Sequence, residues 1–597
     1  MKRHEAHVGG ITSLVTAAVF VVGLLVLAVR LREVQVEEAD YYGYAGDRQS
    51  LRRVQTCGLR GRILARSGSE TVVLADNRRS VTIALRPADF QRRTASNTVE
   101  RIAQAIAEAE SVIGRPSRLD RRAIARHVNQ SPALTLAVWT DVDHEMLARY
   151  SEHEADLAGF ECYETEERVY PYGGETAHVV GYVGRARRES EAGDVKFNYC
   201  LPEMCGRSGL ELYYDSYLRG VPGERSLRVD ARGFTRGTRE IAAAQRGPDL
   251  RLNLDLRVQR AAALALQGLK GACVALDPRD GAVLAFVSAP AFEPNAFVPT
   301  LDAALYARYS SDPAKPLLNR ASGGTYPPGS TFKPVTALAA QSVGVPSDMT
   351  YCCRGVFEYG GMRLHCASRW GHGDMDMRHA LMKSCNPYFC HIGVDVGTNV
   401  LLRAARAFGL GAKTGLDFGA DAAGVVPDGE WKRRVYGESW YPGDLAQMSI
   451  GQGMLLVTPL QMARVAAAIG TGYLVTPRLG ERTPVERQEL AFSSESLRVI
   501  RDGMRMVVAG DGDTRGTGWR GGDGVPVAVS GKTGTAEVGM GERRRKNTWF
   551  IAYAPSESPT IAIAMVVENG ESGGGTTAPK VAEVLKAYFG EKEDAHG

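Results

Sequence analysis

Tyr326-Pro327-Pro328-Gly329-Ser330-Thr331-Phe332-Lys333-Pro334 is followed by an apolar, alanine-rich run at Val335–Ala340. The prolines and the glycine predict a turn. A proline is tolerated in a helix only near its first turn, so we expect a helix to begin close to Ser330. Ser330 and Lys333 then share one helix face and lie within reach of each other. A serine hydroxyl is a weak nucleophile, and a lysine whose pKa is lowered by burial can act as its base. The motif S-x-x-K is short, so on its own it is equally typical of an exposed helix face.

Two shorter motifs follow along the chain. Ser384-Cys385-Asn386 comes after a helical stretch at Ala380–Met382, in a loop-like break. Lys532-Thr533-Gly534-Thr535 continues an alternating segment at Val525–Val529, which we expect to be a strand. Gly534 would let a ligand approach that strand closely. Each motif alone is weak evidence, but S-x-x-K on a helix, S-x-N in a loop and K-T-G on a strand together form the signature of penicillin-interacting serine acyltransferases.

Composition excludes several classes of protein. The 597 residues are 44% apolar and 23% charged, which is ordinary for a globular protein with a core. Lys and Arg number 72 and Asp and Glu number 68, and the net charge of +4 argues against a nucleic-acid binder and against a disordered chain. The 10 cysteines are too few for a disulfide scaffold of this length.

The N-terminal region contains one long apolar stretch. Val8–Val29 carries no charged side chain and would span roughly 33 Å as a helix, enough to cross a bilayer. The apolar region of a cleaved signal peptide is usually about 7–15 residues long, and no small-x-small cleavage site follows, so we expect an uncleaved anchor. Lys2 and Arg3 before the stretch are balanced by Arg30 and Arg32 after it. These charges alone leave the orientation open.

The rest of the chain predicts an α+β protein. From about residue 41 to residue 246, strand-like segments mix with charged helical ones, among them an amphipathic helix at Val99–Ile113. The pattern changes near Pro248. Strands at both ends of the following region, with helices between them, favour one sheet with a helical insertion. The strands expected there are Cys273–Leu276, Val283–Val287, Val525–Val529, Thr548–Ala554 and Ile561–Glu568, and the helices include Asp255–Leu269, Leu460–Ile469 and Thr577–Phe589.

The three motifs and four supporting stretches point to one family. The chain resembles class B penicillin-binding proteins of the elongation type, which are peptidoglycan D,D-transpeptidases. The resemblance implies an antiparallel sheet covered by helices, plus a helical subdomain, in the catalytic domain. The implied domains are a cytoplasmic tip and transmembrane anchor at 1–32, a noncatalytic pedestal of the dimerisation type at 33–247, a transpeptidase domain at 248–590 and a disordered tail at 591–597. The supporting stretches are Arg60-Gly61-Arg62-Ile63, Arg168-Val169-Tyr170-Pro171, Ser208-Gly209-Leu210-Glu211, and Gly451-Gln452-Gly453 with Thr458-Pro459-Leu460-Gln461.

The resemblance also implies a mechanism. Ser330 would attack the carbonyl between the two terminal D-Ala residues of a donor stem peptide, Lys333 would accept its proton, and Ser384 would pass that proton to the departing D-Ala. Backbone N–H groups of Ser330 and Thr535 would form the oxyanion hole. An amine of a neighbouring stem would then take the acyl group, and β-lactams would acylate the same serine. The residues implied in substrate binding are Asn386, Lys532, Thr533, Gly534 and Thr535.

Cysteines cluster between and beside the motifs. Cys353, Cys366, His372 and Cys385 could form a closed set of three thiolates and one imidazole that holds structural zinc, and Cys352 is an alternative first ligand. The alternative is a disulfide, for example between Cys353 and Cys366, as in many exported proteins. The resemblance favours zinc, because many elongation-type relatives carry a similar series. Zinc at Cys385 would fix the S-x-N motif to a neighbouring loop.

The resemblance implies partners and a location. The substrates would be peptidoglycan stem peptides, the partners a SEDS-type glycan polymerase and rod-shape proteins, and no nucleic acid is expected. Because the substrate lies outside the cytoplasmic (inner) membrane, the single-pass anchor would place the catalytic domain on the periplasmic or extracytoplasmic side. In that oxidising compartment we expect Cys200 and Cys205 to form a disulfide.

Other functions share some of these features. A D,D-carboxypeptidase or a β-lactamase-like hydrolase would use the same serine, but the sequence has no Glu-x-x-Leu-Asn motif of the class A β-lactamase type. A division-type class B transpeptidase would share the three motifs, although the Cys and His series argues against it. A membrane-anchored β-lactam sensor would need a cytoplasmic output domain, for which the residues before Val8 are too few. A scaffold that mainly holds partner proteins is a further alternative.

Overall fold

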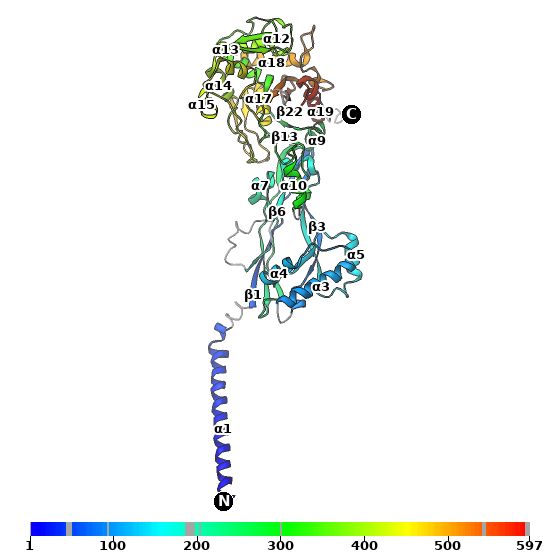
Figure 1. The fold of residues 1–597 in the computed structure, drawn as a ribbon, viewed down its shortest axis with the longest axis vertical. Helices are drawn as coiled ribbons and strands as arrows, with labels where there is room; N and C mark the ends of the chain where they lie inside the picture. Colours follow the sequence, from blue (N-terminus) through cyan, green and yellow to red (C-terminus); the bar gives the residue numbers. More distant parts are fainter. Residues whose placement is uncertain are drawn as a thin grey trace.

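The computed structural model describes residues 2–42, 50–91, 95–185, 198–201, 204–298, 301–539 and 545–590. Over this part of the chain the molecule is elongated. The helix α1 (Lys2–Arg32) lies at one end, a strand-rich pedestal in the middle and a larger C-terminal domain at the other end (Figure 1). The tail at 591–597, predicted to be disordered, lies outside the described residues.

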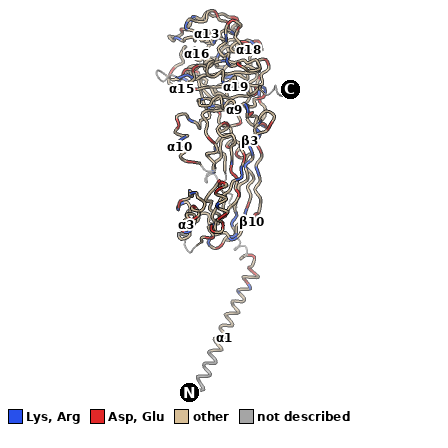
Figure 2. The backbone as a smooth tube through the Cα atoms, turned by 90° about the vertical axis from the view of Figure 1, so that its right-hand side faces the viewer, with Lys and Arg blue, Asp and Glu red and all other residues tan. Residues whose placement is uncertain are grey.

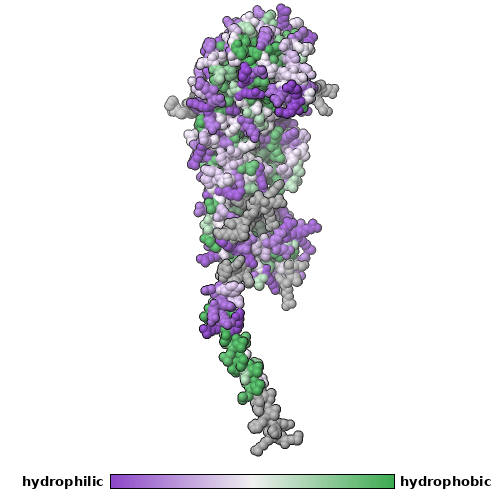
Figure 3. Space-filling view, turned by 90° about the vertical axis from the view of Figure 1, so that its left-hand side faces the viewer, coloured by the Kyte–Doolittle hydropathy of each residue, from purple (hydrophilic) through white to green (hydrophobic). Residues whose placement is uncertain are grey.

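The helix α1 confirms the predicted apolar helix. The segment Ser13–Glu37 has a mean hydropathy of 2.6 and is long and apolar enough to cross a membrane. None of its most apolar window is buried inside the protein. Figure 3 shows the apolar surface of this helix beside the mixed polar surface of the pedestal. It continues into a π-helical turn, η1 (Glu33–Glu37).

The pedestal contains two main sheets. Their strand orders are β10-β9-β1-β7 and β11-β2-β3-β4, and β5 pairs with β3. Basic and acidic residues mix along these strands (Figure 2), and β6 and β8 form a separate pair. The strands are β1 Leu51–Thr56, β2 Ile63–Ser67, β3 Glu70–Leu85, β4 Leu136–Trp139, β5 Phe160–Val169, β6 Val183–Arg185, β7 Tyr199–Cys200, β8 Met204–Gly206, β9 Gly223–Val229, β10 Thr235–Ala242 and β11 Leu250–Asp255.

The helix α3 (Ala95–Ile113) confirms the predicted amphipathic helix of the pedestal. Ile102 and Ile106 are buried at helical spacing and pack in one core with Ile83 and Leu85 of β3. A helix with one apolar face is stable in this place because the sheet covers that face. The other helical segments of the pedestal are η2 Pro87–Phe90, α4 Arg121–Gln130, α5 His144–Glu152, η3 Gly173–Glu175, α6 Ala177–Val180, α7 Gly209–Tyr213 and α8 Asp215–Leu218.

A buried ionic network closes the pedestal next to the C-terminal domain. Glu211, which is fully buried, accepts hydrogen bonds from Arg60 Nη2 at 2.7 Å and from Arg168 Nε at 2.7 Å. Tyr214, just beyond α7, donates to Asp417 of the C-terminal domain at 3.0 Å. Three of the four supporting stretches of the sequence therefore meet at this junction.

A five-stranded antiparallel sheet, β13-β12-β22-β21-β20, forms the centre of the C-terminal domain. Strands from both ends of the region thus form one sheet, as predicted. Alternate residues face two cores: Val274 of β12 packs with α11 and α17, and Cys273 packs with α9 and α19. The elements are α9 Leu256–Ala265, β12 Gly271–Leu276, β13 Val283–Ala289, α17 Pro459–Thr471, β20 Ser530–Val538, β21 Arg545–Ala554, β22 Ile561–Glu568 and α19 Ala578–Phe589.

The strand predicted at Val525–Val529 is wrong. The burial of the residues alternates there, but the chain bends at Pro526 and Val527, and β20 begins only at Ser530. Pro526 has no N–H group to donate to a ladder, and the carbonyl of Ala528 accepts from the backbone N–H of Ser556 at 2.8 Å. The alternating pattern therefore belongs to the irregular segment that precedes the strand carrying K-T-G.

A helical insertion lies between β13 and β20, as predicted. The helix α11 is buried from Lys333 to Ala340, so its small side chains let neighbouring helices approach closely. Three short strand pairs, β14 with β17, β15 with β16 and β18 with β19, flank the helices. The elements are η5 Pro294–Phe297, α10 Ala303–Ser311, α11 Lys333–Gln341, β14 Tyr351–Cys353, β15 Val356–Tyr359, β16 Met362–His365, β17 Gly373–Met375, α12 Met377–Met382, α13 Asn386–Val396, α14 Thr398–Ala407, α15 Gly429–Tyr436, α16 Pro442–Ser449, β18 Tyr473–Val475, β19 Arg487–Glu489, α18 Ser494–Ala509 and η7 Trp519–Gly522.

Candidate active site

Ser330 lies in the 3-10 turn η6 (Gly329–Phe332), and α11 begins directly after this turn. The predicted helix start is confirmed to within one turn. Gly329 has φ +55°, a backbone conformation that favours glycine, and its N–H donates to the carbonyl of Gly451 at 2.8 Å. A Cβ atom at Gly329 would lie 3.1 Å from the carbonyl oxygen of Thr535. The turn that carries the serine is therefore held between Gly451 and β20.

Lys333 is fully buried and faces the S-x-N motif. Its Nζ donates to Asn386 Oδ1 at 2.6 Å and to the carbonyl of Ser384 at 2.7 Å, and it lies 3.4 Å from Ser384 Oγ. The hydroxyl of Ser330 makes no hydrogen bond with any described residue. Burial lowers the pKa of Lys333 to about 8, because a charged amine loses its hydration there. A large share of this amine is therefore neutral in mildly alkaline solution.

Ser384 connects the three motifs. It lies between α12 and α13 at φ +56°, a conformation that costs a non-glycine residue about 1–3 kcal/mol. Lys532 Nζ donates to its Oγ at 2.8 Å. Burial, and the nearby amine of Lys333, hold the pKa of Lys532 well below its usual value. A hydroxyl can accept one hydrogen bond while it donates another, so Ser384 can pass a proton between groups on either side.

The K-T-G motif lies on β20, the edge strand of the central sheet. One edge of β20 pairs with β21, and the other offers backbone groups to an extended ligand. Thr533 Oγ1 donates to Thr517 Oγ1 at 3.0 Å. Thr535 Oγ1 accepts from the N–H of Gly573 at 3.3 Å, at the start of the π-helical turn η9 (Gly573–Thr577). Both threonine hydroxyls are thus oriented by neighbouring loops.

Gly534 permits a close approach of protein to β20. A Cβ atom at this position would lie 2.9 Å from the carbonyl oxygen of Pro328 and 2.9 Å from Thr331 Cγ2. The absence of a side chain lets the turn that carries the serine pack directly on the strand. The predicted approach of a ligand at Gly534 remains a prediction.

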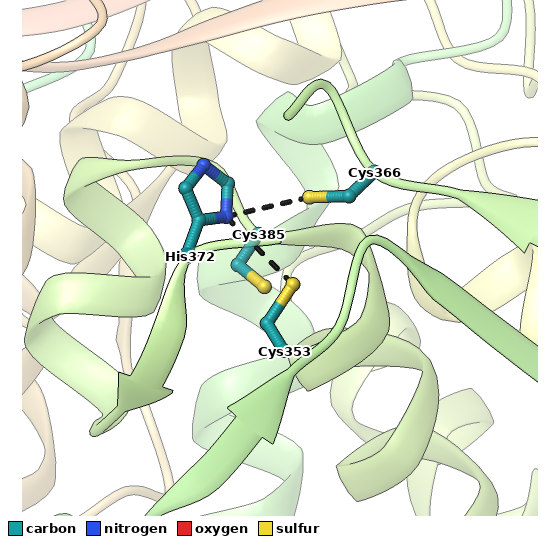
Figure 4. Close-up of side chains that lie close together, drawn as sticks. All are labelled: Cys353, Cys366, His372 and Cys385. Carbon is teal, nitrogen blue, oxygen red and sulfur yellow. Dashed lines mark hydrogen bonds between the residues drawn. The ribbon is translucent and has the colours of Figure 1, made fainter. Parts of the chain in front are cut away.

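Four potential metal ligands lie together beside the S-x-N motif. The Sγ atoms of Cys353, Cys366 and Cys385 and a ring nitrogen of His372 all lie within 4.8 Å of one another. They converge from four segments (Figure 4). His372 Nδ1 lies 3.4 Å from Cys366 Sγ and 3.9 Å from Cys353 Sγ. Cys353 and Cys366 are free, so the alternative disulfide between them is not formed, and Cys352 is exposed.

The chemistry of this cluster fits Zn²⁺. Cys353 ends β14, Cys366 follows β16, His372 precedes β17 and Cys385 caps α13. Hydrogen bonds from Cys385 and His372 lower the pKa of Cys366, which favours the thiolate that binds metals. Three thiolates and one imidazole form a closed tetrahedral set of the kind found in structural zinc sites.

Cys200 and Cys205 lie on the short strands β7 and β8. The side chain of Cys200 lies outside the described residues, and the Sγ of Cys205 donates to the carbonyl of Gly184 at 3.5 Å. The disulfide between Cys200 and Cys205 remains a prediction.

Two polar residues that sequence motifs do not identify join the site. Thr517 donates to the carbonyl of Met382 at 3.1 Å and accepts from Thr533. Gln452 Nε2 donates to the carbonyl of Thr535 at 3.3 Å. Gln452 belongs to one of the supporting stretches, so the resemblance could have indicated it. Nothing in the sequence marks Thr517, which reaches the site only through the tertiary fold.

Both globular parts of the chain match known family models. Residues 56–252 match the penicillin-binding protein dimerisation domain, and residues 271–586 match the penicillin-binding protein transpeptidase domain, which is more than half of the chain. The chain belongs to the penicillin-binding protein transpeptidase family.

Several relatives of this penicillin-binding protein are similar over most of their length. The chain is 32% identical to the peptidoglycan D,D-transpeptidase MrdA of Acinetobacter baumannii, over 95% of this chain and 86% of that protein. It resembles penicillin-binding protein 2 in its complex with MreC from Helicobacter pylori, with a TM-score of 0.77 and 26% identity over 91% of this chain and 99% of that one. It also resembles a chain of a peptidoglycan synthase complex, with a TM-score of 0.71 and 30% identity over 96% and 98% of the two chains.

Proposed function

We propose that this penicillin-binding protein is a peptidoglycan D,D-transpeptidase of the elongation type, which cross-links stem peptides through an acyl-enzyme on Ser330. One observation carries the proposal: the three motifs form one continuous set of contacts. Lys333 binds Ser384 and Asn386, and Lys532 binds Ser384 from the strand. The relatives named MrdA and penicillin-binding protein 2 support the elongation type.

In the proposed acylation, neutral Lys333 accepts the proton of Ser330 Oγ as this oxygen bonds to the carbonyl carbon of the penultimate D-Ala. Backbone N–H groups of Ser330 and Thr535 stabilise the tetrahedral oxyanion. The C–N bond to the terminal D-Ala then breaks, and Ser384 passes the proton to the departing amine. An amine of a neighbouring stem attacks the ester, which forms the cross-link and releases Ser330.

The donor stem is proposed to lie extended along the open edge of β20. Thr533 and Thr535 bind its terminal carboxylate through their hydroxyls. The carboxylate would favour the protonated form of Lys532, so Lys532 would become positively charged when the donor binds. Asn386 Nδ2 already donates to the carbonyl of His365 at 2.8 Å, and its second hydrogen is free for a donor amide.

We infer that Cys353, Cys366, His372 and Cys385 hold a structural Zn²⁺ ion. When bound, the ion would supply a fixed cross-link rather than a reactive group. Cys385 is the middle residue of the S-x-N motif, so this cross-link would restrain Ser384 and Asn386. The close spacing of the four donors supports this assignment.

We further propose that α1 anchors the chain in the cytoplasmic membrane with the catalytic domain outside. The substrate of the reaction lies on that side, and α1 has the length and hydropathy of a single span. The relatives found in complexes with MreC and in a peptidoglycan synthase complex support rod-shape and glycan-polymerase partners for this chain.

The full-length protein in detergent, labelled with a fluorescent penicillin, tests the proposal. We expect covalent, slowly lost label on the parent and none on Ser330→Ala. Ser342→Ala, which removes a hydroxyl bonded to its own helix, should label like the parent. Rapid loss of label would indicate a hydrolase instead, and no label on folded parent protein would overturn the transpeptidase. Depletion in cells separates the two class B types, since loss of rod shape supports elongation and filamentation supports division.

A further inference from the structure

Trp370 is the most exposed large apolar side chain in the described part of the protein. It is 87% exposed, more than any apolar side chain that the structure describes in α1, where Leu14 reaches 76%. Side chains of the membrane helix are expected to be exposed in the isolated chain, but Trp370 lies in the C-terminal domain. Aromatic side chains of this kind provide large, rigid contact surfaces in recognition sites.

The loop that carries Trp370 is held on both sides. The N–H of Cys366 donates to the carbonyl of Gly355 at 2.9 Å, and the N–H of His372 donates to the carbonyl of Cys353 at 3.1 Å. Inside the loop, Ser368 Oγ donates to the carbonyl of Gly371 at 2.6 Å. Hydrogen bonds therefore hold the backbone of the loop that carries the exposed indole.

This loop borders the active site on the side of the S-x-N motif. The carbonyl of His365, the last residue of β16, accepts from Asn386 Nδ2 at 2.8 Å. Trp370 follows His365 by five positions, so its Cα atom lies within about 18 Å of the Cα atom of His365. The donor stem is proposed to occupy β20 on the other side. The loop therefore adjoins the S-x-N motif through His365.

The charge around Trp370 suits an anionic ligand. The guanidinium carbon of Arg369 lies 5.7 Å from the indole centroid. Arg354 and Arg369 are exposed and make no ion pair with a described residue. A flat aromatic face beside an arginine can stack on a sugar ring while the guanidinium binds a carboxylate.

We propose that Trp370 and Arg369 form a subsite for the acceptor strand of peptidoglycan. The indole stacks on a pyranose ring of the acceptor glycan, and the guanidinium binds a carboxylate of the acceptor stem. The subsite holds the acceptor amine near the acyl-enzyme and takes no part in acylation. This inference rests on the proposed transpeptidase function.

Two assays that use the same donor distinguish an effect on acceptor binding from an effect on the donor. The first measures cross-linking of uncross-linked polymeric peptidoglycan by the full-length protein. The second measures exchange of the terminal D-Ala for a free D-amino acid, a small acceptor without glycan. We expect Trp370→Ala to lower the ratio of cross-linking to exchange about five- to tenfold. Trp370→Phe should recover much of the ratio, and Arg369→Gln should lower it in the same direction.

The matched control is Leu264→Ala, which removes another exposed apolar side chain, 71% exposed, from α9. It should keep the parental ratio. An unchanged ratio in Trp370→Ala and Arg369→Gln overturns the subsite, and so does an equal fall in both reactions, which would indicate a donor contact or a structural role. If the parent performs neither reaction, the proposed function fails instead.

Discussion

Ser384 is the residue at which two buried amines meet. Lys333 approaches it from the helix and Lys532 from the strand, and both are fully buried. Two charged amines in one dry site repel each other, so burial and proximity together favour a neutral form. In the proposed mechanism, this arrangement would supply a base for Ser330 and a path for its proton in one cluster.

The first prediction concerns pH. Only the neutral amine of Lys333 can accept a proton, and its pKa is lowered to about 8. The second-order rate constant for acylation by a β-lactam should therefore rise with pH and level off above a midpoint near pH 8. Stopped-flow labelling across this range measures it, with thermal melting to confirm that the protein stays folded. A rate that is independent of pH on both sides of the midpoint would contradict Lys333 as the base.

At the scale of single elements, the sequence predicts a strand or motif well where a local pattern of residues is enough to determine it. The strand at Ile561–Glu568 was predicted at its observed bounds, because both of its faces are buried and its apolar run is continuous. The segment at Val525–Val529 has an alternating pattern. Such a pattern indicates which side chains are buried, but it does not indicate a partner strand. The catalytic motifs were recognisable because their residues are close in sequence. Thr517 joins them only through packing, which no local pattern encodes.

The β14 to β17 segment yields a prediction about metal. Cys366→Ser should lower the zinc content of the purified protein from about one ion per chain towards none, and should lower the melting temperature by several degrees, because a closed site contributes folding energy. Cys352→Ser is the matched control, since Cys352 is exposed and lies outside the cluster. Elemental analysis and calorimetry provide the readouts. Equal zinc content in both variants would refute the proposed ligand set.

The strand β20 yields a prediction about packing. Gly534→Ala would place a Cβ atom 2.9 Å from Pro328 O and from Thr331 Cγ2. We expect penicillin labelling to be lost and the free energy of unfolding to fall by about 1–3 kcal/mol. Gly237→Ala in the edge strand β10 meets nothing within 4 Å and should label like the parent. Normal labelling of Gly534→Ala would show that the turn and the strand can separate without loss of the site.

At the scale of the whole molecule, the ionic network around Glu211 lies inside the pedestal, close in sequence to Tyr214, whose hydroxyl donates to Asp417 of the catalytic domain. Arg60 and Arg168 are 5% and 2% exposed in their side chains, and both depend on the same carboxylate. Removal of that carboxylate would leave the buried guanidinium of Arg168 without its carboxylate partner and would leave Arg60 with Asp215 alone. This end of the pedestal is therefore held together by charge as well as by apolar packing.

Glu211→Ala should lower the free energy of unfolding by about 3–5 kcal/mol, as for other broken buried ion pairs. Glu583→Ala removes a carboxylate whose side chain is 66% exposed and which pairs with Lys586, and it should cost about 0–1 kcal/mol. Urea unfolding measures both variants. Similar costs for the two would mean that the network does not stabilise the pedestal.

The length of the pedestal also determines how far the catalytic domain moves when the base of the pedestal tilts. β3 alone extends over 16 residues, which is about 53 Å at 3.3 Å per residue, and the catalytic domain lies at the end far from α1 (Figure 1). Over this length, a tilt of about 5° at the base of the pedestal moves its far end sideways by about 5 Å. Reacting atoms must approach to about 3–3.5 Å. A protein that binds only the base of the pedestal could therefore move Ser330 towards or away from a peptidoglycan strand without contacting the catalytic domain.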